Sequence, residues 1–197
     1  MARERAALLI VDVQNDFCRS GALAVTDGDQ VVPVLNRYSA RFRTLGLPIY
    51  ASRDWHPRRS AHFAEFGGPW PVHCVQSTHG AAFHPDLVLP DAANIISKGV
   101  DFEDDGYSGF EGTFADGATL EERLTHDQIE HVYIGGLATD YCVRSSALDA
   151  RKSGRRVTLL VDAIRGVDVH SGDSERALAE MTKAGIETTS LGALILE

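Results

Sequence analysis

Two stretches of the sequence, ALLIVDV (7–13) and RRVTLLVD (155–162), decide the fold class. Both contain consecutive apolar residues, LLIV (8–11) in the first and LLV (159–161) in the second, whereas a strand with one exposed face alternates apolar and polar residues. Strands of this kind are buried on both faces, which is typical of a parallel sheet covered by helices on each side. The sequence therefore predicts an α/β protein.

Further short apolar runs recur along the chain, and segments with helical spacing of apolar residues lie between them. Connections of this kind are typical of parallel strands joined by crossover helices. The six predicted strands, all parallel, are 7–13, 47–53, 94–98, 131–136, 155–162 and 186–191, and the predicted helices are 29–45, 118–126, 139–153 and 172–184.

Length and composition restrict the class of protein. A chain of 197 residues, 44% of them hydrophobic, is expected to form one domain over 1–197. The net charge of −9 disfavours nucleic acid and anionic membranes as partners, so a small molecule is expected. Three cysteines without a framework spacing, and no signal-peptide pattern, indicate reduced thiols and a cytoplasmic protein. Whether the protein forms a homo-oligomer stays open.

The segment 54–93 has no clear period and is rich in His, Pro, Gly and Phe. Long loops inside compact domains are usually functional or disordered. The five aromatic residues and five histidines of this segment favour function, so we expect a binding-loop insertion.

Four polar residues fall at the carboxyl ends of predicted strands: Asp12, Asp54, Lys98 and Cys142. These ends gather along one edge of a parallel sheet, where ligands bind at the point at which strand order reverses. Taken singly, Asp12 could be a loop cap, Lys98 an exposed strand end and Cys142 a core thiol. Their convergence is what indicates a site.

Together these side chains could activate a thiol. A helix N-terminus and a nearby cation lower the pKa of a cysteine, so Lys98 is expected to lower that of Cys142. Asp12 could accept the thiol proton and later protonate a leaving amine. Thr139 or Asp140 is expected to be the N-cap, leaving main-chain N–H groups to hold an oxyanion.

The segment DWHPRRSAHFAEFGGPWPVHC (54–74) carries a second cluster of polar residues. Asp54 and His56, two residues apart on extended chain, point the same way, and His62 and His73 can fold back to meet them. Three histidines and one carboxylate suit zinc, iron or manganese. Cys74 could be a further ligand or a packed core thiol.

Five blocks in order along the chain form a recognisable set: IVDVQNDFC (10–18), DWHPRRSAHF (54–63), WPVHCVQST with AAFHPDL (70–87), SKGVDFEDDGYSGFEGT (97–113) and GGLATDYCVRSSALDA (135–150). With these blocks the sequence resembles the nicotinamidase/pyrazinamidase branch of the isochorismatase-like (cysteine hydrolase) superfamily. The resemblance implies a three-layer αβα sandwich with a six-stranded parallel sheet, and hydrolysis of nicotinamide, and of pyrazinamide, through a cysteine thioester in NAD salvage.

The resemblance also implies a role for individual residues. By position, Asp12, Lys98 and Cys142 match the family's catalytic triad. Family members carry a cis peptide at the position of Leu137–Ala138, which implies an oxyanion hole formed by the N–H groups of Ala138 and Cys142.

The family's metal ligands match Asp54, His56 and His73, and His62 matches a fourth ligand that part of the family has. One divalent ion is implied, with zinc favoured over iron or manganese. The expected substrate-binding residues are Phe17, Trp70, Tyr107 and Leu137, with the first two flanking the pyridine ring.

Two groups of alternatives stay open. The first comprises N-carbamoylsarcosine, ureidoacrylate and isochorismate hydrolases, which share the fold and generally lack the Asp-x-His metal cluster. The second is a protein that only binds a ligand or buffers metal, although binding alone needs no thiol, carboxylate and amine in one crevice.

Overall fold

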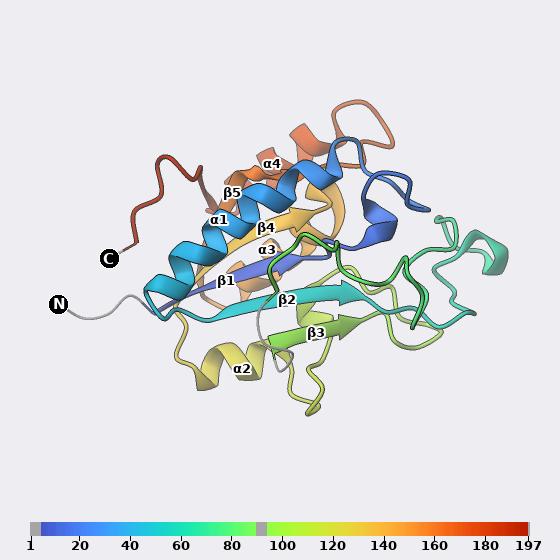
Figure 1. Cartoon of the computed structure of the whole chain (residues 1–197), viewed down its shortest axis with the longest axis horizontal. Helices are drawn as coiled ribbons and strands as arrows, with labels where there is room; N and C mark the ends of the chain where they lie inside the picture. Colours follow the sequence, from blue (N-terminus) through green and yellow to red (C-terminus); the bar gives the residue numbers. More distant parts are fainter. Residues whose placement is uncertain (1–4, 90–93, 197) are drawn as a thin grey trace.

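A computed structural model describes residues 5–89 and 94–196, and it contains a six-stranded sheet in the order β3-β2-β1-β4-β5-β6 with every pair parallel. The prediction of six parallel strands is therefore confirmed (Figure 1). The strands are β1 (Ala6–Val11), β2 (Ile49–Asp54), β3 (Ile95–Lys98), β4 (His131–Leu137), β5 (Arg156–Arg165) and β6 (Glu187–Thr189). The α-helices are α1 (Val31–Thr44), α2 (Leu120–His126), α3 (Arg144–Lys152) and α4 (Asp173–Lys183).

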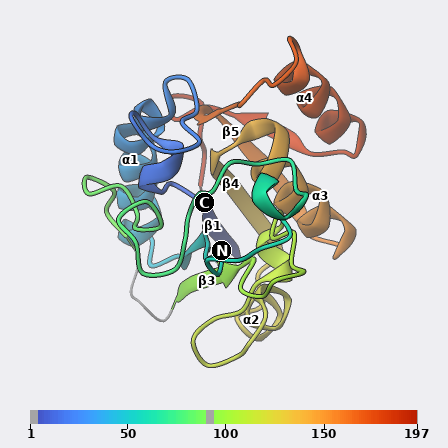
Figure 2. The same cartoon turned by 90° about the vertical axis from the view of Figure 1, so that its right-hand side faces the viewer.

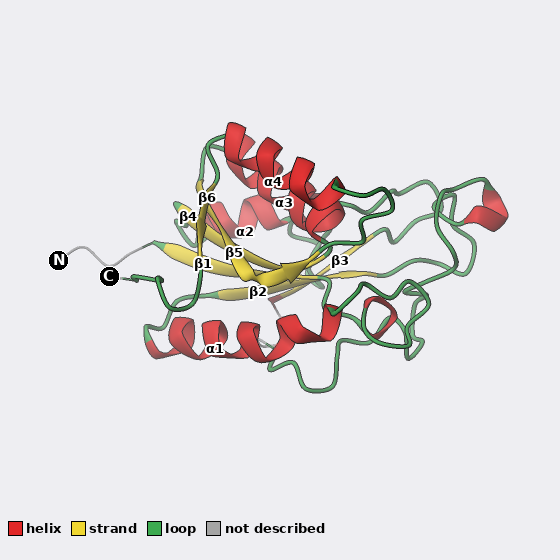
Figure 3. Ribbon diagram, turned by 90° about the horizontal axis from the view of Figure 1, so that it is seen from above, coloured by secondary structure: helices red, strands yellow, loops and turns green. Residues whose placement is uncertain are grey.

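The helices form a layer on each face of the sheet, with α1 on one side and α2, α3 and α4 on the other (Figure 3). Successive residues of β1 supply both cores, because side chains alternate between the faces of a strand. Leu8 and Ile10 belong to the core under α1, and Leu9 and Val11 to the core on the opposite face. Continuous hydrophobicity therefore did indicate a sheet covered on both sides.

The strand order reverses between β1 and β4. From β1 the chain runs outward to β2 and β3, and it then returns to β4 and runs the other way to β6. Right-handed crossovers place α1 and α3 on opposite faces for this reason. At the reversal, Gly136 has a φ of +129°, and a Cβ there would lie 2.0 Å from the Val11 carbonyl oxygen. A glycine allows β1 and β4 to approach closely at the edge where ligands are expected.

Several predicted boundaries differ from the structure. The segment predicted as one helix from 139 to 153 begins with a π-helical turn, Thr139–Val143, and becomes α-helical only at Arg144. Helix α2 begins at Leu120 because Thr119 caps it, accepting a hydrogen bond from the Glu122 N–H. Strand β6 covers only Glu187–Thr189 of the predicted 186–191.

The predicted insertion at 54–93 is loop from Trp55 to Leu89 apart from a short 3₁₀ helix, Ala64–Phe66, and isolated bridges; its residues 90–93 lie outside the described part of the chain. Much of this loop lies beyond the carboxyl ends of β1, β2 and β3 (Figure 1), and Figure 2 looks onto that edge of the sheet. No helix among the described residues has the length and hydrophobicity needed to cross a bilayer.

Candidate active site

The strand ends bring the four predicted polar residues together, and all four are buried. Lys98, the last residue of β3, has its Nζ 2.7 Å from Asp12 Oδ2 and 3.5 Å from Cys142 Sγ, and it also pairs with Asp54 Oδ1. A carboxylate oxygen of Asp12, one of Asp54 and Cys142 Sγ lie within 4.8 Å of one another. The convergence expected from the parallel sheet is therefore present.

One ammonium group faces two carboxylates in this cluster. The pKa values of the ammonium and of one carboxylate rise, and that of the other carboxylate falls. Burial lowers the pKa of Lys98, but Asp12 and Asp54 outweigh it and raise the pKa well above its usual value. Burial raises the pKa of Asp54, but Lys98 and His56 lower it below its usual value. Burial raises the pKa of Asp12 to about 6, although Lys98 and the Ser52 hydroxyl, 2.7 Å from Asp12 Oδ1, oppose the shift.

Lys98 lowers the pKa of Cys142, as expected, but the net shift of this pKa is upward. Burial raises the pKa of this thiol well above its usual value, and Lys98 only partly offsets it while Asp12 and Asp54 raise it further. Burial is the largest cause, and Lys98 offsets it only in part because two carboxylates share the charge of this lysine. Cys142 therefore rests as a thiol, and Asp12, with a pKa near neutrality, is the neighbouring group suited to accept its proton.

The turn that carries Cys142 also differs from expectation in its cap. Ala138 precedes the π-helical turn, and neither Thr139 nor Asp140 caps it with a side chain. The Asp140 carboxylate instead accepts hydrogen bonds from the Val167 and Asp168 N–H groups at 2.9 and 2.8 Å. The cis peptide that the resemblance implied is present between Leu137 and Ala138.

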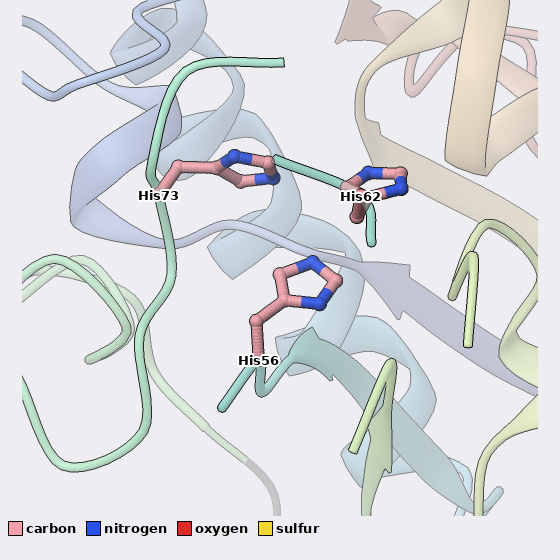
Figure 4. A group of neighbouring side chains, drawn as sticks. All are labelled: His56, His62 and His73. Atoms are coloured by element: carbon pink, nitrogen blue, oxygen red, sulfur yellow. The ribbon is translucent and has the colours of Figure 1, made fainter. Parts of the chain in front are cut away.

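The three predicted histidines of the insertion meet next to this cluster. One ring nitrogen from each of His56, His62 and His73 lies within 4.8 Å of the others, and Figure 4 shows the rings around a common space. Asp54 Oδ2 lies 3.8 Å from His56 Nε2 and 3.9 Å from His73 Nε2. The four residues predicted as metal ligands are therefore neighbours.

The donor groups of this cluster suit a divalent transition metal. His56 Nδ1 and His73 Nδ1 lie 3.1 and 2.7 Å from the carbonyl oxygens of Gly99 and Pro71, so each Nδ1 carries the proton and each Nε2 keeps its lone pair. Among the described residues, His56 Nε2 is one of the few buried polar atoms without a hydrogen bond. Burial lowers the pKa of His62 to about 4 and also lowers that of His73, which keeps both rings neutral and able to ligate.

Cys74, the alternative ligand beside His73, is fully buried in the hydrophobic core and is absent from the histidine group. Burial raises its pKa well above the usual value, which disfavours the thiolate that a metal needs. The structure therefore agrees with a packed core thiol at this position.

A cavity that is partly open to solvent joins the thiol cluster to the histidines. Of the predicted substrate-binding residues, Phe17, Trp70 and Tyr107 line it, and the Trp70 Nε1–H donates to the Tyr107 hydroxyl at 2.9 Å. Leu137 does not line it, since this side chain is fully buried in the core under α1.

Three lining residues were not predicted: Leu23, Tyr141 and Val167. Tyr141 could have been found, because it directly precedes Cys142. Its ring packs edge-on against Trp70 with the centroids 4.8 Å apart. Leu23 and Val167 carry no signal in the sequence, since both are single apolar residues in loops that only the fold brings to the cavity.

Comparison with known proteins agrees with this geometry. The family model described as the isochorismatase domain matches residues 6–192. This chain belongs to the isochorismatase family. Within the family it is similar to the nicotinamidase of Escherichia coli, with 39% identity over 198 residues that cover 91% of this chain and 92% of that protein.

Two solved structures of the family are similar over nearly the whole chain. The pyrazinamidase of Pyrococcus horikoshii in complex with zinc has 46% identity and a TM-score of 0.87, covering 95% of this chain and 99% of that one. PnC1 from L. infantum in complex with nicotinate has 33% identity and a TM-score of 0.87, covering 100% of this chain and 99% of that one.

Proposed function

We propose that this member of the isochorismatase family is a nicotinamidase, a metal-dependent hydrolase that converts nicotinamide to nicotinate and ammonia and also accepts pyrazinamide. The observation that carries the proposal is a cavity lined by Cys142 on one side and by His62 and His73 on another. Asp12 and Lys98 lie next to the thiol, and His56 completes the group of three histidines. The similarity to nicotinamidases and to a pyrazinamidase supports it.

In the proposed mechanism, Asp12 removes the proton from the Cys142 thiol as Sγ attacks the carboxamide carbon of the substrate. The C–S bond forms and the carbonyl electron pair moves onto oxygen, where the N–H groups of Ala138 and Cys142 hold it. Asp12 then returns the proton to the nitrogen, and the C–N bond breaks to release ammonia and leave a thioester.

Water completes the cycle. Asp12 accepts a proton from a water molecule that attacks the thioester carbon, the C–S bond breaks, and the proton passes to the departing sulfur. Lys98 keeps Asp12 available as a base, because its charge opposes the effect of burial on the Asp12 pKa. A carboxylate with a pKa of about 6 can both accept and donate a proton near neutral pH.

The other wall of the cavity would bind the pyridine ring. Phe17 and Trp70 both line it and offer aromatic faces to a flat substrate, while the bond from Trp70 to Tyr107 fixes the indole. We assign Tyr107 to substrate binding through this contact. Leu137 supports the wall only from behind, because it is buried in the core.

Asp54, His56 and His73 would hold the metal, with His62 as the fourth ligand and zinc as the favoured ion over iron or manganese. When bound, the ion would supply a site for the ring nitrogen of the substrate and orient the carboxamide toward Cys142. We further propose that the protein acts in NAD salvage and is located in the cytoplasm. Residues 1–197 would form one functional domain, and the protein could form a homo-oligomer.

Ammonia release from nicotinamide and from benzamide tests the proposal. Benzamide has the same carboxamide on a ring of similar shape but lacks the ring nitrogen, so we expect the zinc-loaded protein to use it poorly. His73→Ala should lower the zinc content and the kcat/KM for nicotinamide strongly while changing that for benzamide little. Equal losses for both amides would refute the assigned role of the metal, and no release from nicotinamide by the wild type would refute the nicotinamidase.

A further inference from the structure

The turn after β1 carries a buried glutamine whose side chain reaches the predicted metal ligand Asp54. Gln14 is fully buried, and its Oε1 accepts the Asp54 N–H at 2.8 Å. Its Nε2 donates to the Asp54 carbonyl at 2.8 Å and to the Ala81 carbonyl at 2.9 Å. One side chain therefore holds both main-chain polar groups of Asp54 and ties them to the loop that follows His73.

Asp16, two residues further on, holds the main chain next to His73. Its Oδ2 accepts the N–H of Cys74, the residue after His73, at 2.7 Å. Its own N–H donates to the Gly80 carbonyl at 3.0 Å. A Cβ at Gly80 would lie 2.0 Å from Asp16 Oδ2, so the loop can approach this carboxylate closely only with glycine there.

We propose that Gln14 and Asp16 are positioning residues for the metal site, Gln14 by fixing the main chain of Asp54 and Asp16 by fixing that of His73. The inference rests on the proposed function, because it needs a metal at this cluster. Neither side chain would touch the ion. Groups that orient metal ligands in this way typically contribute about 10-fold to 100-fold to metal affinity.

A matched control is available in Asn36 on α1. Its Nδ2 donates to the Asp86 carbonyl at 2.7 Å and its Oδ1 accepts the Val88 N–H at 2.8 Å, so it also bridges two main-chain groups of a loop. Neither Asp86 nor Val88 is a predicted ligand. Gln14→Glu and Asn36→Asp are the same chemical change: each keeps the size and the acceptor oxygen and removes the N–H donors.

The experiment measures zinc affinity of the purified full-length protein by competition with a chromogenic chelator. We expect Gln14→Glu to bind zinc about 10-fold to 100-fold more weakly than the wild type, and Asn36→Asp to stay within about threefold of it. Thermal melting with excess chelator shows whether each variant is folded. Asp16→Asn, which keeps one acceptor oxygen, is expected to weaken zinc binding about 10-fold. This variant tests the proposal if Gln14→Glu does not fold.

Two results would overturn the inference. If the wild type binds zinc and the Gln14 and Asp16 variants bind it as tightly as Asn36→Asp does, these residues do not position the ligands, and the proposed metal site still stands. If the wild type binds zinc no more tightly than His73→Ala does, the metal site of the proposed function fails, and the positioning role fails with it.

Discussion

Lys98→Met is expected to destabilise the protein in a way that depends on pH. The substitution keeps most of the length of the side chain but leaves two buried carboxylates, Asp12 and Asp54, without the ammonium that lies 2.7 Å from Asp12. Removing one partner of a buried ion pair typically costs about 3–5 kcal/mol. We expect a loss of that size in the free energy of unfolding at pH 7.

The pH dependence follows from the pKa of Asp12, which is raised to about 6 in the wild type. A raised carboxyl pKa means that the folded state holds a proton that the unfolded state has released, so stability rises as pH falls through the folded pKa. Without Lys98 this pKa rises further, and the variant keeps its Asp12 proton up to pH 7. Between pH 7 and pH 5 the deficit of the variant should therefore shrink by about 1.4 kcal/mol, the equivalent of one pKa unit.

Urea unfolding of both proteins at pH 5 and pH 7, in the presence of chelator so that only the charges of the chain contribute, measures this difference. Asn36→Asp provides the control for a substitution away from the cluster. A deficit that is equal at the two pH values would refute the coupling between Lys98 and Asp12. A deficit below about 1 kcal/mol at pH 7 would mean that the pair is not buried as described.

Three further outcomes are expected. Cys142→Ala should lower nicotinamide hydrolysis by at least about 100-fold without changing zinc content, and more residual activity in an ammonia assay would contradict the covalent mechanism. The kcat/KM of the zinc-loaded wild type should fall as pH drops below about 6, since protonated Asp12 cannot accept the thiol proton, and a flat profile between pH 5 and 7 would exclude Asp12 as the base. Cys18→Ala, in the core under α1, should cost about 1 kcal/mol in urea unfolding and leave kcat unchanged, whereas a large loss of kcat would give Cys18 a role in the reaction.

The fold could be predicted because its signals are local. The apolar run of β1 is long enough to require burial on both faces. Asp12, directly after β1, and Asp54 and Lys98, which end β2 and β3, stand out against such runs. The order of the strands is not local, because the reversal between β1 and β4 depends on how distant segments pack. The convergence of Asp12 and Cys142 could therefore be expected from the sheet type, but their distance could not.

The electrostatics of the site show where reading the sequence residue by residue fails. A lysine near a cysteine suggests a lowered thiol pKa, but the effect depends on how many other charges the lysine meets and how deeply all of them are buried. Here Asp12 and Asp54 share Lys98, and burial dominates the pKa of Cys142. Gln14 was missed for a related reason, since its contacts with Asp54 and Ala81 join segments 40 and 67 residues away.

Asp54 belongs to both halves of the site, which determines how their roles can be separated. Its Oδ1 pairs with Lys98, while its Oδ2 lies 3.8 Å from His56 Nε2 and 3.9 Å from His73 Nε2. A substitution of Asp54 would remove a partner of the lysine and a carboxylate of the histidine cluster at once, so its effect on activity could not be assigned to either. The two roles must therefore be tested by substitutions at residues other than Asp54. Substitution of Cys142 tests the thiol chemistry, and substitution of His73 tests the binding of the ring nitrogen.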